Sequence, residues 1–223
     1  MKRQPLRWGA PARRVAVCGR PAGLRLGLTL APGMRVGLFG GSFNPVHDGH
    51  AHVAEVALQR LGLDRLIWLV SPQNPLKTGQ DTAPLAARMA GVQRLAGRRE
   101  IVSDLETRLG VAYTIDTVRI LRARFPGVHF VWIMGSDNLA SFHRWRGWTD
   151  LLRAVPVAVV SRPGALLQSR LGPAARRFPH GRLPSRESRL LPFLAPPAWT
   201  FLRGPLHTAS STAIRAKLAA RQG

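Results

Sequence analysis

The chain has 223 residues, of which 45% are hydrophobic and 20% are charged, so it holds enough apolar material for a core and wholesale disorder is excluded. Its single cysteine, Cys18, excludes an intramolecular disulfide and a cysteine-built metal site, which indicates a reducing compartment and a cytoplasmic protein. No stretch approaches the roughly 18 apolar residues of a membrane-spanning helix, so we expect no membrane association.

The chain is strongly basic. It has 33 lysine and arginine residues against 11 aspartate and glutamate residues, a formal net charge of +22. Such a charge attracts nucleic acids, and it also attracts small molecules that carry phosphates. The cations are not interleaved with aromatic side chains along a predicted surface strand or helix, and the sequence carries no nucleic-acid-binding motif. We therefore expect no stable nucleic-acid partner, although a basic nucleic-acid-binding protein stays open as an alternative of a different functional class.

The first 33 residues differ in composition from the rest. They hold no acidic residue, are interrupted by four prolines and show no sustained apolar periodicity. We predict a basic, mostly disordered tail over residues 1–33 and a single folded domain over residues 34–223. A protein that begins at Met34 is expected to keep full activity.

From Met34 onward, predicted strands and helices alternate. Strands are predicted at 34–39, 65–70, 100–104, 128–134, 155–161 and 199–202. Helices are predicted at 48–61, 84–96, 113–125, 148–155 and 210–222. A proline-rich loop at 71–83 and an irregular segment at 163–197 complete the pattern. This alternation predicts an α/β fold, a Rossmann-like doubly wound parallel sheet, with ligands at the carboxyl ends of the strands.

The motif GGSFNPVHDGH at 40–50 follows the first predicted strand. Gly40 and Gly41 let the backbone pass close to a bulky group. His47 and His50 stand where the first helix begins, and free N–H groups there attract anions. Two imidazoles at that point are suited to holding phosphate oxygens as charge develops on them. Two alternatives remain: a metal site that also uses His52, and surface histidines without a special role.

A second motif, SSTAIR at 210–215, precedes the last predicted helix. Ser210, Ser211 and Thr212 are typical of an ordinary helix cap. With Arg215 one turn into the helix, hydroxyl groups, backbone N–H groups and a guanidinium also favour a second phosphate site. Both interpretations stay open.

Three segments between these motifs also place polar or aromatic side chains after strands. Pro72 and Pro75 stiffen a loop that presents Lys77, unless this is only a solvated lysine. The segment AYTIDT, 112–117, either contributes to the site or is only a capped helix. In the segment 133–148, Asp137 is placed to hold a ribose or a metal-bound ligand, and Trp145 is suited either to stacking on a flat ring or to core packing.

The first motif resembles the phosphate-binding signature of the H-x-G-H nucleotidyltransferase superfamily, with His47-Asp48-Gly49-His50 as the match. SSTAIR resembles the I-S-S-T-x-I-R signature of the same superfamily, although Ala209 replaces the usual isoleucine. The blocks SPQNPLK, YTIDT, MGSDNL, FHRW and SRPG, in this order, are similar to those of bacterial nicotinate-nucleotide adenylyltransferases. A sister enzyme such as pantetheine-phosphate adenylyltransferase is the nearer alternative, but by resemblance it is shorter and lacks SPQNPLK and FHRW.

The resemblance implies transfer of an adenylyl group from ATP to nicotinate mononucleotide, in NAD biosynthesis, with Mg²⁺ accompanying ATP. It implies catalytic roles for His47, His50 and Arg215. It implies ATP-binding roles for Gly40, Gly41, Ser42, Phe43, Gly135, Arg162, Ser210, Ser211 and Thr212. It implies roles in binding nicotinate mononucleotide for Asn74, Lys77, Thr114, Asp137 and Trp145. No protein residue is predicted to bind a metal by itself, and a homo-oligomer is compatible with the sequence.

Overall fold

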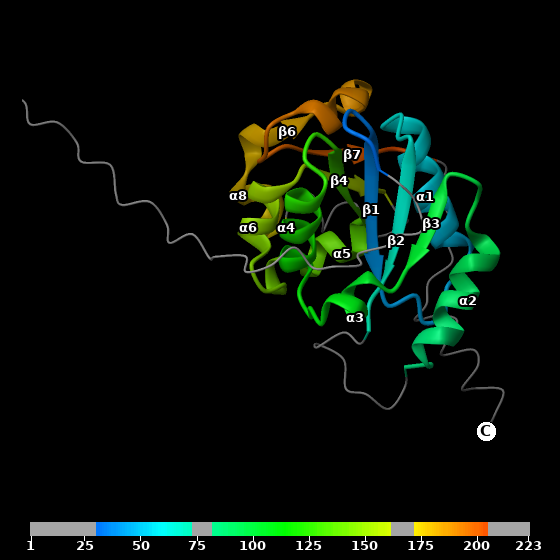
Figure 1. Cartoon of the computed structure of the whole chain (residues 1–223). Helices are drawn as coiled ribbons and strands as arrows, with labels where there is room; N and C mark the ends of the chain where they lie inside the picture. The colour runs from blue at the N-terminus through cyan, green and yellow to red at the C-terminus, as the bar shows by residue number, and fades with distance from the viewer. Residues whose placement is uncertain (1–29, 73–81, 162–171, 205–223) are drawn as a thin grey trace, which may run out of the picture.

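The computed structural model describes residues 30–72, 82–161 and 172–204. Within these residues, seven parallel strands form one sheet in the order β3-β2-β1-β4-β5-β7-β6 (Figure 1). The strands are β1 (Arg35–Gly41), β2 (Arg65–Val70), β3 (Glu100–Ser103), β4 (His129–Gly135), β5 (Val157–Val160), β6 (Arg182–Leu183) and β7 (Trp199–Leu202). Because the chain runs outward from β1 to β3 and then returns to begin β4 on the other side of β1, the strand order reverses between β1 and β4.

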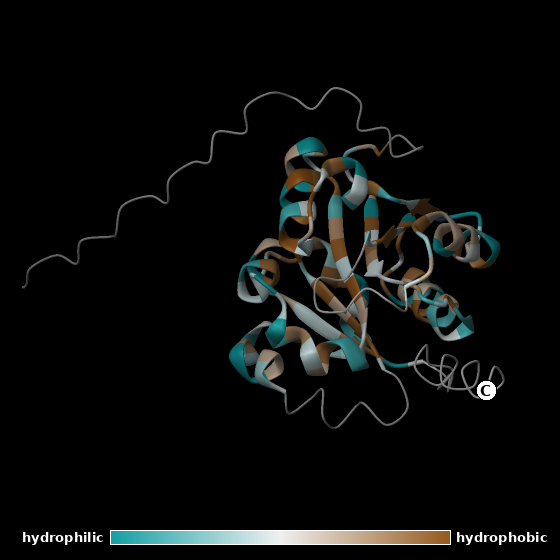
Figure 2. Cartoon of the chain, turned by 90° about the horizontal axis from the view of Figure 1, so that it is seen from below, coloured by the Kyte–Doolittle hydropathy of each residue, from teal (hydrophilic) through white to brown (hydrophobic). Residues whose placement is uncertain are grey.

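Helices cover both faces of this sheet (Figure 1). One face packs against α1 (Asp48–Arg60), α2 (Leu85–Leu95) and the 3-10 helix η4 (Ser185–Phe193). The other packs against α3 (Leu105–Leu109), α4 (Thr114–Arg124), α5 (Ser136–Ser141), η2 (Phe142–Arg144), α6 (Trp148–Ala154) and α8 (Pro173–Arg177). Hydrophobic residues follow the strands, and hydrophilic residues lie mostly on the outer helix faces (Figure 2). Each face of the sheet thus forms its own hydrophobic core with the helices that cover it, and these two core clusters confirm the predicted Rossmann-like, doubly wound α/β fold.

Every predicted strand and helix that falls within the described residues is present, with ends that differ by two residues or fewer. The helix predicted at 210–222 lies outside the described residues. No helix among the described residues is long and apolar enough to cross a membrane.

The prediction of an irregular segment at 163–197 was wrong for its described part, which begins at Gly172. This part contains α8, η3 (Pro179–Gly181), β6 and η4. The two-residue strand β6 is defined by its pairing with β7, and α8 has only five residues. Elements this short repeat no apolar position, so periodicity does not reveal them. The short helices α3, α5 and η2 were missed for the same reason.

The predicted tail ends earlier than residue 33. Leu30 is only 6% exposed and belongs to the core cluster under α4. The backbone N–H of Gly33 donates a hydrogen bond to the Gly127 carbonyl at 2.7 Å, and Pro32 lies against Gly127. Leu24, Leu26, Leu28 and Leu30 alternate with other residues in the sequence, and the prediction of a tail through residue 33 overlooked this short period-two pattern.

These contacts give a first testable prediction. A protein that begins at Met34 loses the burial of Leu30, which contributes roughly 1.5–3 kcal/mol for a leucine side chain. We expect its free energy of unfolding in urea to fall by about 2 kcal/mol relative to a protein that begins at Leu30, while kcat stays the same. Equal unfolding midpoints would show that Leu30 contributes nothing, and a lower kcat would place the segment in the site.

Candidate active site

The candidate site lies at the carboxyl ends of β1 and β4, where the strand order reverses. Open parallel sheets bind ligands at this kind of position, because the loops after the two strands diverge there. Phe39 pairs with Ile133, so Gly41 and Gly135 each stand two residues further along neighbouring strands. A Cβ on Gly40 would collide with the indole of Trp132 on β4. The bulky group that Gly40 accommodates is therefore this buried indole.

The two histidines of the first motif lie together at the start of α1. His47 is the N-cap residue and His50 is the third residue of the helix. Their ring centroids are 3.9 Å apart, and the ring planes meet at 36°. The backbone N–H of His47 donates to Nδ1 of His50 at 3.3 Å. Because Nδ1 accepts this bond, the proton of a neutral His50 ring is on Nε2. Of the two ring nitrogens of His50, Nε2 is therefore the donor.

Aromatic side chains pack against the ring of His50. The Phe43 ring meets the His50 ring edge-on with centroids 5.1 Å apart, and it also packs against Phe39 and Trp68. Phe43 has a φ of 47°, a left-handed conformation that costs a bulky residue energy and is typical of functional sites. Its side chain is buried in the core, so the predicted ATP contact of Phe43 is limited to its backbone. Ser42, before it, is half-buried.

The loop after β4 supplies the opposite side of the site. Gly135 ends the strand and is the N-cap residue of α5. Asp137, in the first turn of this short helix, is exposed. An exposed carboxylate at the carboxyl edge of the sheet is accessible to a hydroxyl group of a bound ligand.

The structure also brings Thr114 and Trp145 into one region. Thr114 is the first residue of α4, and the ring of Tyr113 before it lies under the guanidinium of Arg146, 4.5 Å from ring centroid to Cζ. Trp145 is half-buried, with edge-to-face contacts to Trp132 at 6.3 Å and to Phe142 at 5.3 Å between centroids. The indole of Trp145 thus packs partly against the core, and the rest of it is accessible to a ligand.

The other predicted site residues lie outside the described residues. They are Asn74, Lys77, Arg162, Ser210, Ser211, Thr212 and Arg215. Their roles stay predictions from the sequence.

Comparisons with known proteins agree with this geometry. The cytidylyltransferase-like family model matches residues 38–217. A protein of Caulobacter sp. (strain K31) named "Probable nicotinate-nucleotide adenylyltransferase" is 66% identical over 185 residues, which cover 82% of this chain and 98% of that protein. A protein of the same name from Parvibaculum lavamentivorans is 49% identical over 187 residues, 83% of this chain and 93% of that protein. The chain belongs to the nicotinate-nucleotide adenylyltransferase family.

A solved structure supports the same fold at greater distance. The Plasmodium falciparum nicotinic acid mononucleotide adenylyltransferase, complexed with NaAD, has a TM-score of 0.62 at 15% identity, covering 82% of this chain and 83% of that one. This structure confirms the predicted fold, and the relatives confirm the predicted family and enzyme class.

The alternative of a metal site built on the histidines finds no support in the part of the chain that the structure describes. There, no group of three or more histidine, cysteine, aspartate or glutamate side chains is placed to hold a metal ion. The paired imidazoles of this family member at the helix start are suited instead to an anion.

Sequence reasoning missed two buried ionisable residues near the site. Arg88 on α2 is 3% exposed, and burial lowers the pKa of its guanidinium. Glu106 on α3 is 7% exposed, and burial raises the pKa of its carboxyl group to about 7, against a smaller lowering by the hydroxyl of Thr117, which donates to it at 3.2 Å. Arg88 falls on the apolar face of its helix, with Leu85 and Val92, and this spacing was the available signal.

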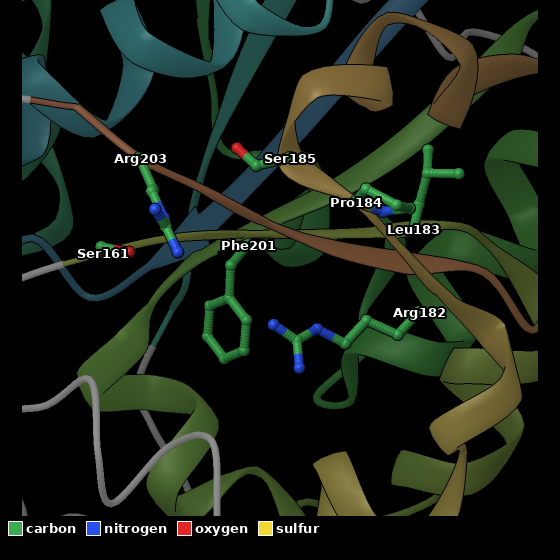
Figure 3. A pocket seen from close by; sticks show the side chains of 7 residues that line it. All are labelled: Ser161, Arg182, Leu183, Pro184, Ser185, Phe201 and Arg203. Carbon is green, nitrogen blue, oxygen red and sulfur yellow. The ribbon is translucent and has the colours of Figure 1, made fainter.

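A pocket that was not predicted lies at the carboxyl ends of β5 and β7 (Figure 3). Its lining is Ser161, Arg182, Leu183, Pro184, Ser185, Phe201 and Arg203. Arg182 packs over the Phe201 ring, with its guanidinium carbon 5.4 Å from the ring centroid. Ser161 and Arg203 directly follow their strands, so the pocket opens on the same edge of the sheet as the candidate site.

Proposed function

We propose that this chain transfers the adenylyl group of ATP to the phosphate of nicotinate mononucleotide, giving deamido-NAD and pyrophosphate. The observation that carries the proposal is the imidazole pair of His47 and His50 at the start of α1, beside the reversal of strand order. The family of the chain supports the same reaction. We also propose that the enzyme acts in the cytoplasm, because a sequence with a single cysteine cannot form an intramolecular disulfide, which is typical of a reducing compartment.

The reaction requires no nucleophile from the protein. An oxygen of the nicotinate mononucleotide phosphate attacks the α-phosphorus of ATP, the bond between the α-phosphorus and the bridging oxygen to the β-phosphorus breaks, and pyrophosphate leaves. Charge builds on the phosphate oxygens during this step. Nε2 of His50 and the backbone at the start of α1 are proposed to stabilise these oxygens, so catalysis consists of positioning and electrostatic stabilisation. Arg215 and residues 210–212 are proposed to hold the departing phosphates.

The nicotinate ring is proposed to lie against Trp145. The pyridinium ring of the mononucleotide is cationic, and an indole face attracts such a ring by roughly 0.5–2 kcal/mol. Backbone N–H groups near Thr114 and Arg146 are proposed to donate hydrogen bonds to the nicotinate carboxylate. Asp137 is proposed to accept hydrogen bonds from ribose hydroxyl groups.

Magnesium fits this arrangement as a companion of ATP. The described residues offer no cage of acidic and histidine side chains, and Mg²⁺ commonly binds through substrate phosphates and water with few protein groups. When bound, the ion would neutralise charge on the phosphates. Among the described site residues, the exposed carboxylate of Asp137 has the charge that would suit a water molecule bound to the ion.

Replacing Trp145 by alanine tests the ring site. We expect the KM for nicotinate mononucleotide to rise about two- to thirtyfold, as 0.5–2 kcal/mol implies, with the KM for ATP nearly unchanged. The preference for nicotinate over nicotinamide should survive, because the carboxylate contacts are separate from the stack. An equal rise in the KM values for both substrates, or unfolding of the variant, would assign the indole to core packing alone.

The substrate itself is tested by pyrophosphate release with ATP and one of three acceptors. We expect release with nicotinate mononucleotide and much less with nicotinamide mononucleotide or phosphopantetheine. Preferred use of phosphopantetheine would support the sister enzyme. A lack of turnover with every acceptor, together with salt-dependent binding of DNA or RNA, would support a nucleic-acid-binding protein.

A further inference from the structure

The side chain of Arg88 is almost fully enclosed and makes four hydrogen bonds to backbone carbonyl groups. Its Nε donates to Ala83 at 2.9 Å, its Nη1 donates to Ser42 and Ser71 at 2.8 Å each, and its Nη2 donates to Pro72 at 2.8 Å. The fork of donors is thus shared among three segments of the chain. A guanidinium suits this task because its donors diverge in a fixed plane.

The three segments include the loop that leads to His47 and His50, the histidines proposed to meet the phosphates of ATP. Ser42 belongs to the first motif, Ser71 and Pro72 directly follow β2, and Ala83 precedes the N-cap residue of α2. Two further hydrogen bonds join the same segments: the N–H of Ser71 donates to the Gly41 carbonyl at 3.0 Å, and the N–H of Ala83 donates to Oδ1 of Asn44 at 3.2 Å. Arg88 therefore lies at the centre of a network that ties the loop after β1 to the loop after β2.

This arrangement is costly for a residue that only fills space. Burial of a charged group is unfavourable unless hydrogen bonds compensate for the lost water. Among the described residues, the hydrogen-bond partners of Arg88 are neutral carbonyl groups, and no carboxylate forms an ion pair with it. Its positive charge therefore remains beneath the loop that leads to His47. An apolar side chain on this face of α2 would bury at lower cost, but it would leave the four carbonyl groups without their donor.

We propose that Arg88 is a positioning residue for adenylyl transfer, which fixes the loop of residues 42–46 so that His47 and His50 meet the phosphates of ATP in the required geometry. The inference rests on the proposed function. Arg88 acts through the backbone of Ser42 and has no contact with substrate. Its charge adds positive potential on the side of the site where phosphate charge develops.

Two substitutions test this role. Arg88→Lys keeps the charge but replaces the planar fork by one nitrogen, which cannot serve Ser42, Ser71, Pro72 and Ala83 together. Arg88→Met removes the charge as well. A misplacement of about 1 Å in a site costs on the order of a hundredfold, so we expect kcat to fall ten- to a hundredfold in Arg88→Lys. We expect the KM for ATP to change little in Arg88→Lys and to rise in Arg88→Met.

The matched control is Arg35→Met, at the amino end of β1. Arg35 donates to Asp64 at 2.7 and 3.1 Å, so its loss also removes half-buried hydrogen bonds, but at the opposite end of β1 from the loop of residues 42–46. All proteins are assayed well below their melting temperatures, so that each is fully folded. We expect Arg35→Met to melt earlier and to keep its kcat within twofold of the unsubstituted enzyme.

The unsubstituted enzyme separates the two proposals. If it fails to turn over nicotinate mononucleotide, the proposed function fails, whatever Arg88 does; the increase in melting temperature caused by ATP then still reports on the loop and should shrink in Arg88→Met. If it is active, a folded Arg88→Lys protein with unchanged kcat would overturn the positioning role. Failure of both Arg88 variants to fold, or an equal loss of kcat in Arg35→Met, would assign Arg88 to stability alone and overturn it as well.

Discussion

Replacing His50 by alanine is expected to lower kcat by about 10²–10³ while the KM for ATP changes much less. Nδ1 of His50 accepts the backbone N–H of His47, so the proton of the neutral ring is on Nε2, which is the ring nitrogen able to donate to phosphate oxygens. Loss of one preorganised donor of this kind typically costs this much in rate, because the donor acts mainly on charge that develops during the reaction. Steady-state kinetics with both substrates give the two constants separately.

His52→Ala is the matched control for this experiment. It removes an imidazole from the same helix, two residues on and therefore about 200° around the helix axis. We expect its kcat to stay close to that of the unsubstituted enzyme. A near-normal kcat for His50→Ala would remove His50 from the mechanism, and equal losses in both variants would point to damage to α1.

The second large effect concerns stability and pH. Burial raises the pKa of the Glu106 carboxyl group to about 7 in the folded protein, from 4.5 in an unperturbed glutamate. The folded state therefore binds more protons than the unfolded state between these values. The free energy of unfolding should be unaffected by this group below about pH 4.5, should fall as the pH rises to about 7, and should then level off, with a total loss of roughly 3 kcal/mol.

Glu106→Gln should remove this pH dependence. The carboxamide oxygen can still accept the hydrogen bond of Thr117, but it carries no charge to bury. We expect the variant to be more stable than the unsubstituted protein at pH 8 and similar to it at pH 4.5, measured by urea unfolding across this range. Glu55→Gln, at an exposed position of α1, should keep the original pH dependence. A flat profile for the unsubstituted protein would contradict the burial argument.

The regular part of the fold could be predicted because each element repeats its signal. The helix predicted at 48–61 and the strand predicted at 65–70 agree with α1 and β2 almost residue by residue. Strand–helix alternation then leaves few topologies, so the sheet and the end of the sheet that carries the site followed. His47 and His50 were found because two histidines at a helix start form a chemical pattern in the sequence itself.

What sequence reasoning missed depends on contacts between distant segments. Arg88 falls on the apolar face of its helix, which suggests burial, but only the fold brings Ser42 and Ser71 to it, 46 and 17 residues away along the sequence. The burial of Glu106 depends on α4, which places Thr117 over it. The aromatic packing around Phe43 directs its ring into the core, which its position in the motif does not reveal. Such contacts have no local period, so patterns along the chain do not contain them.

The central claim is attack of the nicotinate mononucleotide phosphate on the α-phosphorus of ATP, and the position of a label tests it most directly. The enzyme is incubated with nicotinate mononucleotide and ATP that is labelled only at the α-phosphorus, and the products are separated. We expect the label in deamido-NAD and an equal amount of unlabelled pyrophosphate. Labelled AMP without deamido-NAD, or formation of a phosphorylated nicotinate mononucleotide without the adenosine moiety, would contradict adenylyl transfer.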